Sequence, residues 1–239
     1  PIAANTNGIF ECLEKGAEYI HWDEKRKAYQ NQTGDIRRGV GMALFSYKTG
    51  VWPISLEIAG ARLSLNQDGS VQLQVGATEI GQGADTVFSQ MAAETLHMDI
   101  SRVHIVTQQD TDVTPFDTGA YASRQSFVTG TAVKECAQQL KQKILEYART
   151  LVPGNVDRLE LEDGYILADG KPAISLEDLA MESYYSLSNS SVLTAEVSRQ
   201  VKKNTVASGC CFAEVEVDMK LGKIKVLDIV NVHDSGTLL

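Results

Sequence analysis

Apolar and polar residues alternate along this chain with two periods, one typical of strands and the other typical of helices. Steps of three and four residues predict a helix over residues 7–27 capped by Thr6 or Asn7, a helix that carries Val87 and Met91, a long helix that ends near Leu151, and a short one over 175–184. Alternation predicts strands within 40–44, 54–65 and 70–75, and a short apolar run predicts another over 103–106. Residues 159–174 are typical of a hairpin, and 211–217 and 224–232 of two long antiparallel strands. Residues 192–201 fit either a strand or a loop.

The order of these elements predicts an α+β fold with mixed, mostly antiparallel sheets and packed helices, because no regular βαβ rhythm is present. Pro153 and Gly154 break the long helix and favour a boundary at that point. We therefore expect a first α+β portion over residues 1–152, which holds the candidate binding loops, and a hairpin-rich portion over 153–239. The alternative is one domain in which the last strands return to pair with the first ones.

A glycine-rich loop over residues 76–86 joins a predicted strand to a predicted helix. At the start of a helix, backbone N–H groups and the helix dipole favour an anion such as a phosphate. On spacing alone the simpler interpretation is favoured, in which the glycines serve only the turn. Neither the GxGxxG nor the GxxxxGK[ST] pattern is present.

A second polar cluster, Ser123 to Ser126, stands at the start of the long helix, where both serines are candidate N-caps. It follows an irregular connection over residues 108–122 that contains Asp110 and Asp112. Long loops inside a compact domain are often functional, but aspartates in such loops also commonly cap local N–H groups. If the two helix starts converge in space, they form a strong anion site.

The composition limits the classes of function. The chain has 239 residues, of which 43% are hydrophobic and 22% charged, the balance of a globular protein with a sizeable core. A net charge of −9 argues against a protein that binds nucleic acid or an anionic membrane, since both need a basic surface. No apolar run has the length of a membrane span.

Cysteine and histidine usage adds two expectations. The four cysteines are Cys12, Cys136, Cys210 and Cys211, and they form no CxxC pair; the four histidines are scattered. This usage predicts reduced thiols in a cytoplasmic protein, without a transition metal bound by the protein's own side chains. The chain also begins at Pro1 and stops just after Asp234–Gly236 without a terminating element, so we expect a fragment of a longer protein.

Several short motifs, taken together and in order, resemble those of the molybdenum-binding subunit of the xanthine dehydrogenase and aldehyde oxidase family. They are Asn66–Val71, the loop Gly76–Gly83, Asp110–Asp112, Ser123–Gln125 before a helix, Ala213–Asp218, Gly222 and Asp234–Gly236. Each motif alone is weak, but the ordered set, which spans roughly residues 39–239, is specific.

The resemblance implies a molybdenum hydroxylase that oxidises a purine, another N-heterocycle or an aldehyde, with water as the source of oxygen. Molybdopterin, in its plain or its cytosine dinucleotide form, would hold the molybdenum, so no protein ligand to the metal is needed. Partner domains or subunits would carry 2Fe-2S clusters and FAD, and a homodimer of the full complex is a further expectation.

The resemblance also implies the site residues. Those expected to bind the cofactor are Ile80, Gly81, Gln82, Ala122, Ser123, Arg124, Gln125 and Ser126. Tyr121 and Ala122 would line the substrate pocket, which Tyr121 would narrow, because purine-oxidising members carry a small residue there. The family's earlier glycine-rich loop and its later glycine-glutamate pair, which supplies the catalytic base, are absent from this sequence. We therefore assign no catalytic residue and expect the fragment alone to be inactive.

The alternative from a different class is a binding module without redox chemistry. Such a module would grip a phosphorylated ligand or act as a docking scaffold for redox partner subunits. The two hypotheses differ in what they require of the full protein. Only the enzyme requires that the missing glycine-rich loop and the catalytic glutamate be present elsewhere in its sequence.

Overall fold

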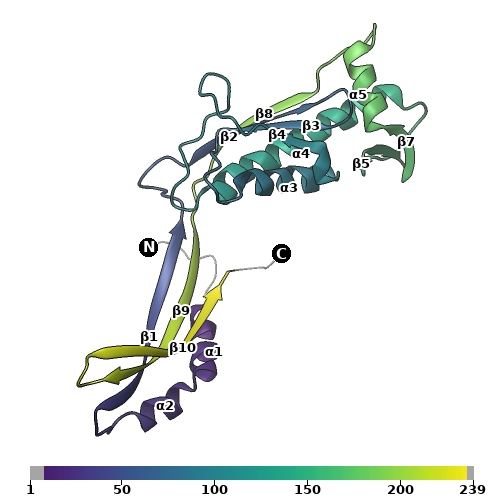
Figure 1. The fold of residues 1–239 in the computed structure, drawn as a ribbon. Coiled ribbons are helices and arrows are strands. Elements are labelled where there is room, and N and C mark those ends of the chain that lie inside the picture. Colours follow the sequence, from purple (N-terminus) through teal and green to yellow (C-terminus); the bar gives the residue numbers. More distant parts are fainter. Residues whose placement is uncertain (1–7, 236–239) are drawn as a thin grey trace. The chain divides into compact units, whose positions relative to one another are not determined.

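The computed structural model describes residues 8–235, and its backbone contacts divide the chain into two compact units. Unit 1 comprises residues 1–49 and 204–239, and unit 2 comprises residues 50–203. The sheets are antiparallel except for one parallel pair, and helices pack against them, as Figure 1 shows. The predicted α+β class with mostly antiparallel sheets is confirmed.

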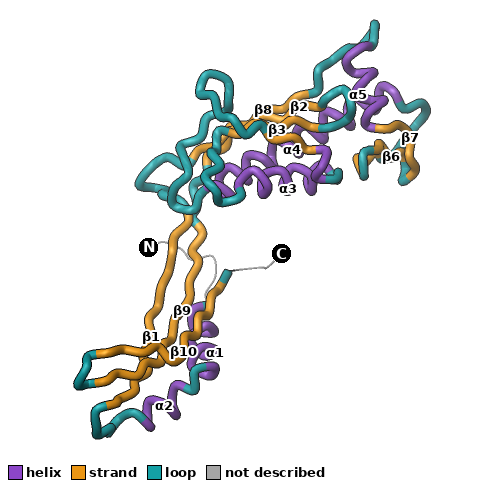
Figure 2. The backbone as a smooth tube through the Cα atoms, viewed as in Figure 1, coloured by secondary structure: helices purple, strands orange, loops and turns teal. Residues whose placement is uncertain are grey.

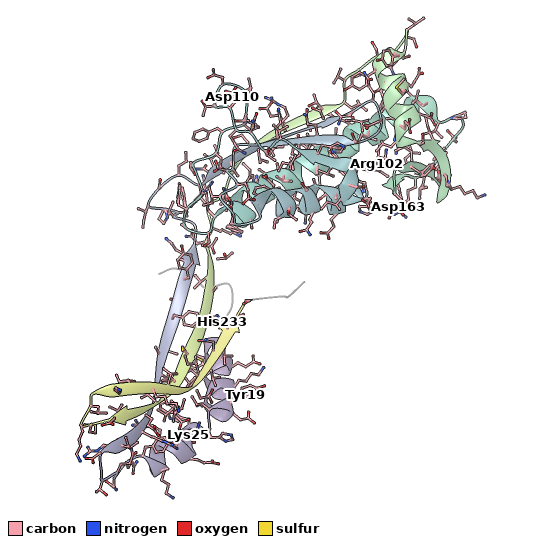
Figure 3. All side chains as sticks on the ribbon, viewed as in Figure 1. Tyr19, Lys25, Arg102, Asp110, Asp163 and His233 are labelled. Atoms are coloured by element: carbon pink, nitrogen blue, oxygen red, sulfur yellow. The ribbon has the colours of Figure 1, made fainter. Side chains whose placement is uncertain are left out.

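Unit 1 is a three-stranded sheet in the order β1–β9–β10 that packs against two helices. Its elements are α1 (Ile9–Tyr19), α2 (Trp22–Ala28), β1 (Ile36–Thr49), β9 (Thr205–Asp218) and β10 (Lys223–Asp234). β1 and β9 pair over their whole length, so the last strands do return to the first ones. Lys25 on α2, labelled in Figure 3, adds an ion pair of 2.6 Å to Glu214 on β9.

The single helix predicted over residues 7–27 is wrong, because the structure has two helices there. His21 adopts a left-handed conformation, with φ of 57°, and separates α1 from α2. After this turn the Trp22 ring packs edge-on against Phe212 of β9, with ring centroids 5.5 Å apart. Helical periodicity alone does not register this tertiary contact. The predicted caps Thr6 and Asn7 lie outside the described residues.

Unit 2 contains the larger core, formed between a four-stranded sheet and two helices (Figure 2). Its main elements are β2 (Ile58–Leu65), β3 (Val71–Val75), α3 (Ala84–Leu96), a 3-10 turn η1 (Ile100–Arg102), β4 (Val103–Ile105), α4 (Gln125–Leu151) and β8 (Thr194–Gln200). The sheet order is β4–β3–β2–β8, and only β3 and β4 run parallel. Residues 192–201, which fitted a strand or a loop, thus contribute a strand.

A small three-stranded sheet and a short helix complete unit 2. They are β5 (Leu159–Glu162), β6 (Tyr165–Ala168), β7 (Lys171–Ser175) and α5 (Leu176–Tyr185). The Ser175 side chain caps α5 by accepting the Asp178 N–H at 3.0 Å, as its sequence context predicts. The N–H of Asp163, labelled in Figure 3, donates to the carbonyl of His97 at 2.8 Å and ties this sheet to the end of α3.

Two further predictions differ from the structure. Residues 54–57 form the end of a turn and an irregular segment rather than a strand, and Ile54 is 86% exposed; β2 begins only at Ile58. The chain also divides at other points than the predicted break after residue 152. Residues 153–203 stay within unit 2 because β8 pairs with β2 in its central sheet.

Within residues 8–235, none of the helices combines the length and the apolar character that crossing a membrane requires.

Gly76, which follows β3, packs so closely on the connection before α4 that a side chain has no room. A Cβ atom at this position would lie 2.1 Å from the Pro115 carbonyl oxygen and 2.9 Å from the Asp117 nitrogen. We predict that Gly76→Ala lowers the midpoint of denaturant unfolding by the equivalent of about 1–3 kcal/mol. Gly41→Ala on β1 is the matched control, because no atom lies within 4 Å of its added Cβ. Equal midpoints for the two variants would contradict the close approach.

Candidate functional site

The two loops singled out in the sequence line one cleft of about 330 Å³ at the starts of α3 and α4, which lie side by side in Figure 1. The lining residues are Ile80, Gln82, Ala84, Val87, Ala120, Tyr121, Ser123, Arg124, Gln125 and Ser126. Most of the residues that the family resemblance implied are therefore brought together. Gly81 and Ala122 are outside this lining, although both belong to its loops.

Two glutamine side chains hold the loops against each other. The Gln82 amide nitrogen donates to the Thr78 carbonyl at 2.9 Å and to the Gln125 amide oxygen. The Gln125 amide nitrogen donates to the same Thr78 carbonyl at 3.1 Å. The Gln82 amide oxygen in turn accepts the Ile80 N–H at 2.6 Å. The glycine-rich loop is thus fixed both to itself and to the first residue of α4.

The start of α3 is occupied by the protein's own carboxylate. Glu79 accepts backbone N–H groups from Gly81 at 2.6 Å, Gly83 at 3.1 Å and Asp85 at 3.2 Å. The hydrogen bond from Asp85, followed by those from the glycines, lowers the pKa of Glu79. This arrangement differs from the sequence-based expectation, because the N–H groups that would meet a phosphate at this helix start already have an anion.

Asp85 has the opposite electrostatic environment. Burial, and then the charge of Glu79, raise the pKa of its carboxyl group. Its Oδ1 atom is one of the few buried side-chain oxygens in residues 8–235 for which no hydrogen-bond partner is found. The Glu79 carboxylate thus disfavours further negative charge in the first turn of α3, which adds to the reasons why an external anion would be disfavoured there.

The start of α4 is open by comparison. Its N-cap residue is Arg124, in a right-handed conformation, and the Arg124 side chain makes no capping hydrogen bond. The prediction that Ser123 or Ser126 caps this helix is therefore wrong, and both serines line the cleft instead. The N–H groups of Phe127 and Val128 donate to the Arg124 carbonyl, which leaves those of Gln125 and Ser126 at the very start of the helix. The dipole of a helix from Gln125 to Leu151 makes this end favourable for an anion.

The turn before α4 is strained. Ala122 and Ser123 both have φ of 50°, a left-handed conformation that costs a residue other than glycine on the order of 1–3 kcal/mol. The Ala122 carbonyl accepts the Gly50 N–H at 2.8 Å, and the Tyr121 carbonyl accepts the Arg124 N–H at 3.2 Å. Strain of this kind persists only where surrounding contacts enforce it, and it is concentrated at functional sites.

The Arg124 side chain turns away from solvent into a fully buried ion cluster. Its Nε donates to Glu57 Oε2 at 2.6 Å, and its Nη1 donates to Asp117 Oδ1 and to the Gly119 carbonyl at 3.0 Å. Its Nη2 donates to the Ile58 carbonyl at 2.8 Å. Burial alone would lower the pKa of Arg124, but the two carboxylates outweigh it and raise this pKa. The guanidinium is thus committed to acceptors within the protein.

Tyr121 and the aspartates of the connection differ in their relation to the cleft. The Tyr121 ring lines it, is 40% exposed, and lies 5.6 Å from the Arg124 guanidinium carbon, within the range of a cation–π contact. Asp110, labelled in Figure 3, accepts the Asp112 N–H at 3.0 Å on an exposed part of the loop. These aspartates therefore form an ordinary loop turn, outside the lining of the cleft.

Sequence reasoning missed three acidic residues that shape the site, namely Glu57, Glu79 and Asp117. Glu57 offers the only direct signal, a carboxylate between two apolar residues at the start of an apolar strand. Glu79 and Asp117 lie in polar loops where a carboxylate is unremarkable. Within residues 8–235, no three His, Cys, Asp or Glu side chains are grouped so that they could hold a metal ion.

Comparison with known proteins identifies the family. A model described as "Molybdopterin cofactor-binding domain" matches residues 15–239. The chain belongs to this family. Its residues thus match a domain that binds the molybdopterin cofactor, in agreement with the resemblance found in the motifs.

Individual relatives are consistent with this assignment. The chain is 48% identical over 235 residues to the "Putative xanthine dehydrogenase molybdenum-binding subunit XdhA" of Escherichia coli (strain K12), covering 97% of this chain and 31% of that protein. It is 31% identical over 237 residues to the "Probable hypoxanthine oxidase XdhD" of the same organism, covering 99% of this chain and 24% of that protein. The chain thus spans a third or less of the length of these relatives.

The fold has known counterparts. Quinoline 2-oxidoreductase from Pseudomonas putida 86 superposes with a TM-score of 0.78 at 21% identity, over 95% of this chain and 31% of that one. At this identity the likeness shows the fold alone.

The contacts of Glu79 give a prediction for pH. A carboxyl group with a lowered pKa in the folded protein stabilises it fully above the ordinary value of 4.5, and this stabilisation is lost as the pH falls through the lower, folded-state pKa. We expect Glu79→Gln to lower the thermal unfolding midpoint at neutral pH, with the difference from the natural protein disappearing on acidification. Glu94→Gln, at the other end of α3, is the control. A carboxylate there opposes the helix dipole, so its removal should be neutral or slightly stabilising. A Glu79→Gln effect that does not change with pH would contradict this account.

Proposed function

We propose that the cleft holds molybdopterin and that the intact protein is a molybdenum hydroxylase of the xanthine dehydrogenase type. The observation that carries the proposal is the uncapped start of α4, with Ser123, Gln125 and Ser126 on the same cleft as the glycine-rich loop. Because Glu79 already fills the start of α3, the phosphate of the cofactor belongs at α4. The family match to a molybdopterin-binding domain supports the same assignment.

The residues present fit such a group. Its phosphate requires N–H and hydroxyl donors, which the α4 start and its two serines offer, and its flat ring system requires amide and backbone groups along an edge. Gln82 and Ile80 provide such groups on the facing loop. When bound, the cofactor would supply the two-electron redox chemistry of molybdenum. The residues of this chain would bind it, orient it and shape the space in front of it.

The proposed reaction is the hydroxylation of a purine or another N-heterocycle, or of an aldehyde, with oxygen from water. The names of the two Escherichia coli relatives mention xanthine and hypoxanthine, so a purine is the best supported of these substrate classes. Electrons would leave through 2Fe-2S clusters and FAD on partner domains or subunits of a cytoplasmic complex, which would form a homodimer. The cofactor would be molybdopterin or its cytosine dinucleotide form.

The test is metal and pterin analysis of the full-length protein that contains this chain, produced with its partners in a host that makes molybdopterin. Molybdenum and pterin in similar amounts would support the proposal. A well-folded protein with neither would reject it and favour a binding module without redox chemistry.

Gln82 gives a prediction within the site. Gln82→Ala removes an amide that makes three hydrogen bonds, to the Thr78 carbonyl, to Gln125 and from the Ile80 N–H, of about 1 kcal/mol each. We expect the cofactor affinity of the full-length protein to fall on the order of tenfold, measured as molybdenum and pterin per folded protein. Gln90→Ala, at an exposed position on α3, is the matched control and should leave both contents unchanged. Equal contents in the two variants would exclude this role for Gln82.

Tyr121 gives a prediction for the substrate. Its ring occupies part of the cleft, so Tyr121→Ala should raise kcat/KM for bulky N-heterocycles relative to small ones, by about 10-fold or more. Phe116→Ala removes another exposed aromatic ring of the same connection, outside the cleft, and should leave the ratio unchanged. The measurement is kcat/KM for a size series of heterocycles. A ratio that is the same in both variants would remove Tyr121 from the substrate pocket.

A further inference from the structure

Three residues have side chains that meet inside unit 2. One of them, Arg124, belongs to a family motif, but no motif contains the three together. They are Glu57 before β2, Asp117 in the connection after β4, and Arg124 at the start of α4; the side chains of both ion pairs have no solvent exposure. We propose that this positioning cluster fixes the strained turn at Ala122 and Ser123, and through it the groups that meet the cofactor. The inference rests on the proposed function.

The cluster determines the orientation of Arg124 completely. Glu57 and the Ile58 carbonyl hold two of its nitrogens from the β2 side, and Asp117 with the Gly119 carbonyl holds the third from the connection. Because the guanidinium is planar, these acceptors on two separate segments fix both its position and its tilt. Arg124 directly follows Ser123, so the second residue of the strained turn has little freedom left.

Further contacts tie the cluster to its surroundings. The other Asp117 oxygen accepts the Thr129 hydroxyl from α4 at 2.7 Å, and Asp117 forms an antiparallel bridge with Ala59 of β2. Glu57 Oε1 accepts the Val51 N–H, next to the Gly50 N–H that binds the Ala122 carbonyl. The same three residues thus connect β2, α4, the connection before α4 and the segment at Gly50 and Val51 that binds the strained turn.

Stability alone is a weak explanation for this arrangement. A buried ion pair gains little over well-packed apolar residues, because removing two charges from water offsets their attraction. Here one cation faces two carboxylates, and further donors are needed to satisfy them. What such a cluster supplies is one defined geometry, which a cofactor site requires and an ordinary core does not.

The first test uses a mild substitution in the full-length protein with its partners. Thr129→Val removes one hydrogen bond to Asp117 without burying a charge or changing the shape of the side chain much. Thr131→Val, two residues along α4, removes a hydroxyl that binds the Phe127 carbonyl instead and is the matched control. Asp117→Asn is the stronger variant. The readouts are molybdenum and pterin per folded protein, the rate of pterin release, kcat per molybdenum, KM and the thermal unfolding midpoint.

We expect Thr129→Val and Asp117→Asn to release pterin several-fold faster than Thr131→Val and to have a lower kcat per molybdenum at nearly unchanged KM. A merely structural role predicts a lower unfolding midpoint with release and kcat per molybdenum as in the control, and that result would overturn the inference. If Asp117→Asn does not fold, Thr129→Val decides by itself.

A second readout separates this inference from the proposed function. Amide hydrogen exchange of residues 120–126 in the cofactor-free protein should be faster in Thr129→Val than in Thr131→Val. If the natural protein holds neither molybdenum nor pterin, the proposed function fails, and the exchange rates still decide whether the cluster fixes the turn. Equal exchange in the two variants would reject the cluster while leaving the proposed function in place.

Discussion

The buried Arg124 is the constraint on which the candidate site depends. Removing one partner of a buried ion pair typically costs about 3–5 kcal/mol, because a charge is left without compensation. Two left-handed residues in the adjacent turn cost on the order of 1–3 kcal/mol each. The two quantities are of similar size, so the ion cluster is strong enough to hold the turn in a conformation that its sequence does not favour.

The two helix starts at the cleft have opposite electrostatic roles. At α3 the protein places its own carboxylate, Glu79, on the loop N–H groups, and this stabilises the glycine-rich loop without any ligand. At α4 the N-cap residue Arg124 takes no such role, because its side chain binds Glu57 and Asp117 instead. One start is therefore a permanent part of the scaffold and the other remains available. The hydrogen bond between Gln82 and Gln125 joins them, and it holds the glycine-rich loop in a fixed position relative to the start of α4.

Local sequence patterns predicted the elements that the residues of one segment specify by themselves. The strands predicted over 211–217 and 224–232 and the cap at Ser175 correspond to β9, β10 and the start of α5. The patterns failed where a distant contact decides, as at His21, where the chain turns so that Trp22 can reach Phe212. They also failed at residues 54–57, whose alternation suggests a strand although Glu57 serves the ion cluster.

The candidate site shows the same difference between local patterns, which are predictable, and distant contacts, which are not. The motifs located both loops, because the residues that give each loop its chemistry are consecutive in the sequence. The interior partners of Arg124 lie 67 and 7 positions away from it, and their pairing exists only after folding. Arg124 in a polar motif reads as a ligand-binding residue, and only its burial shows that its charge is directed inward.

The pairing of β1 with β9 has a consequence for how the protein reaches this structure. All of unit 2 lies between the two strands in sequence, so unit 1 cannot close until both ends of that long insertion are near each other. The entropic cost of closing a flexible loop grows with its length, whereas a folded insertion acts as a short, stiff connection. The favoured order is therefore unit 2 first and β1–β9 second. The binding loops would then be assembled before the two halves of unit 1 meet.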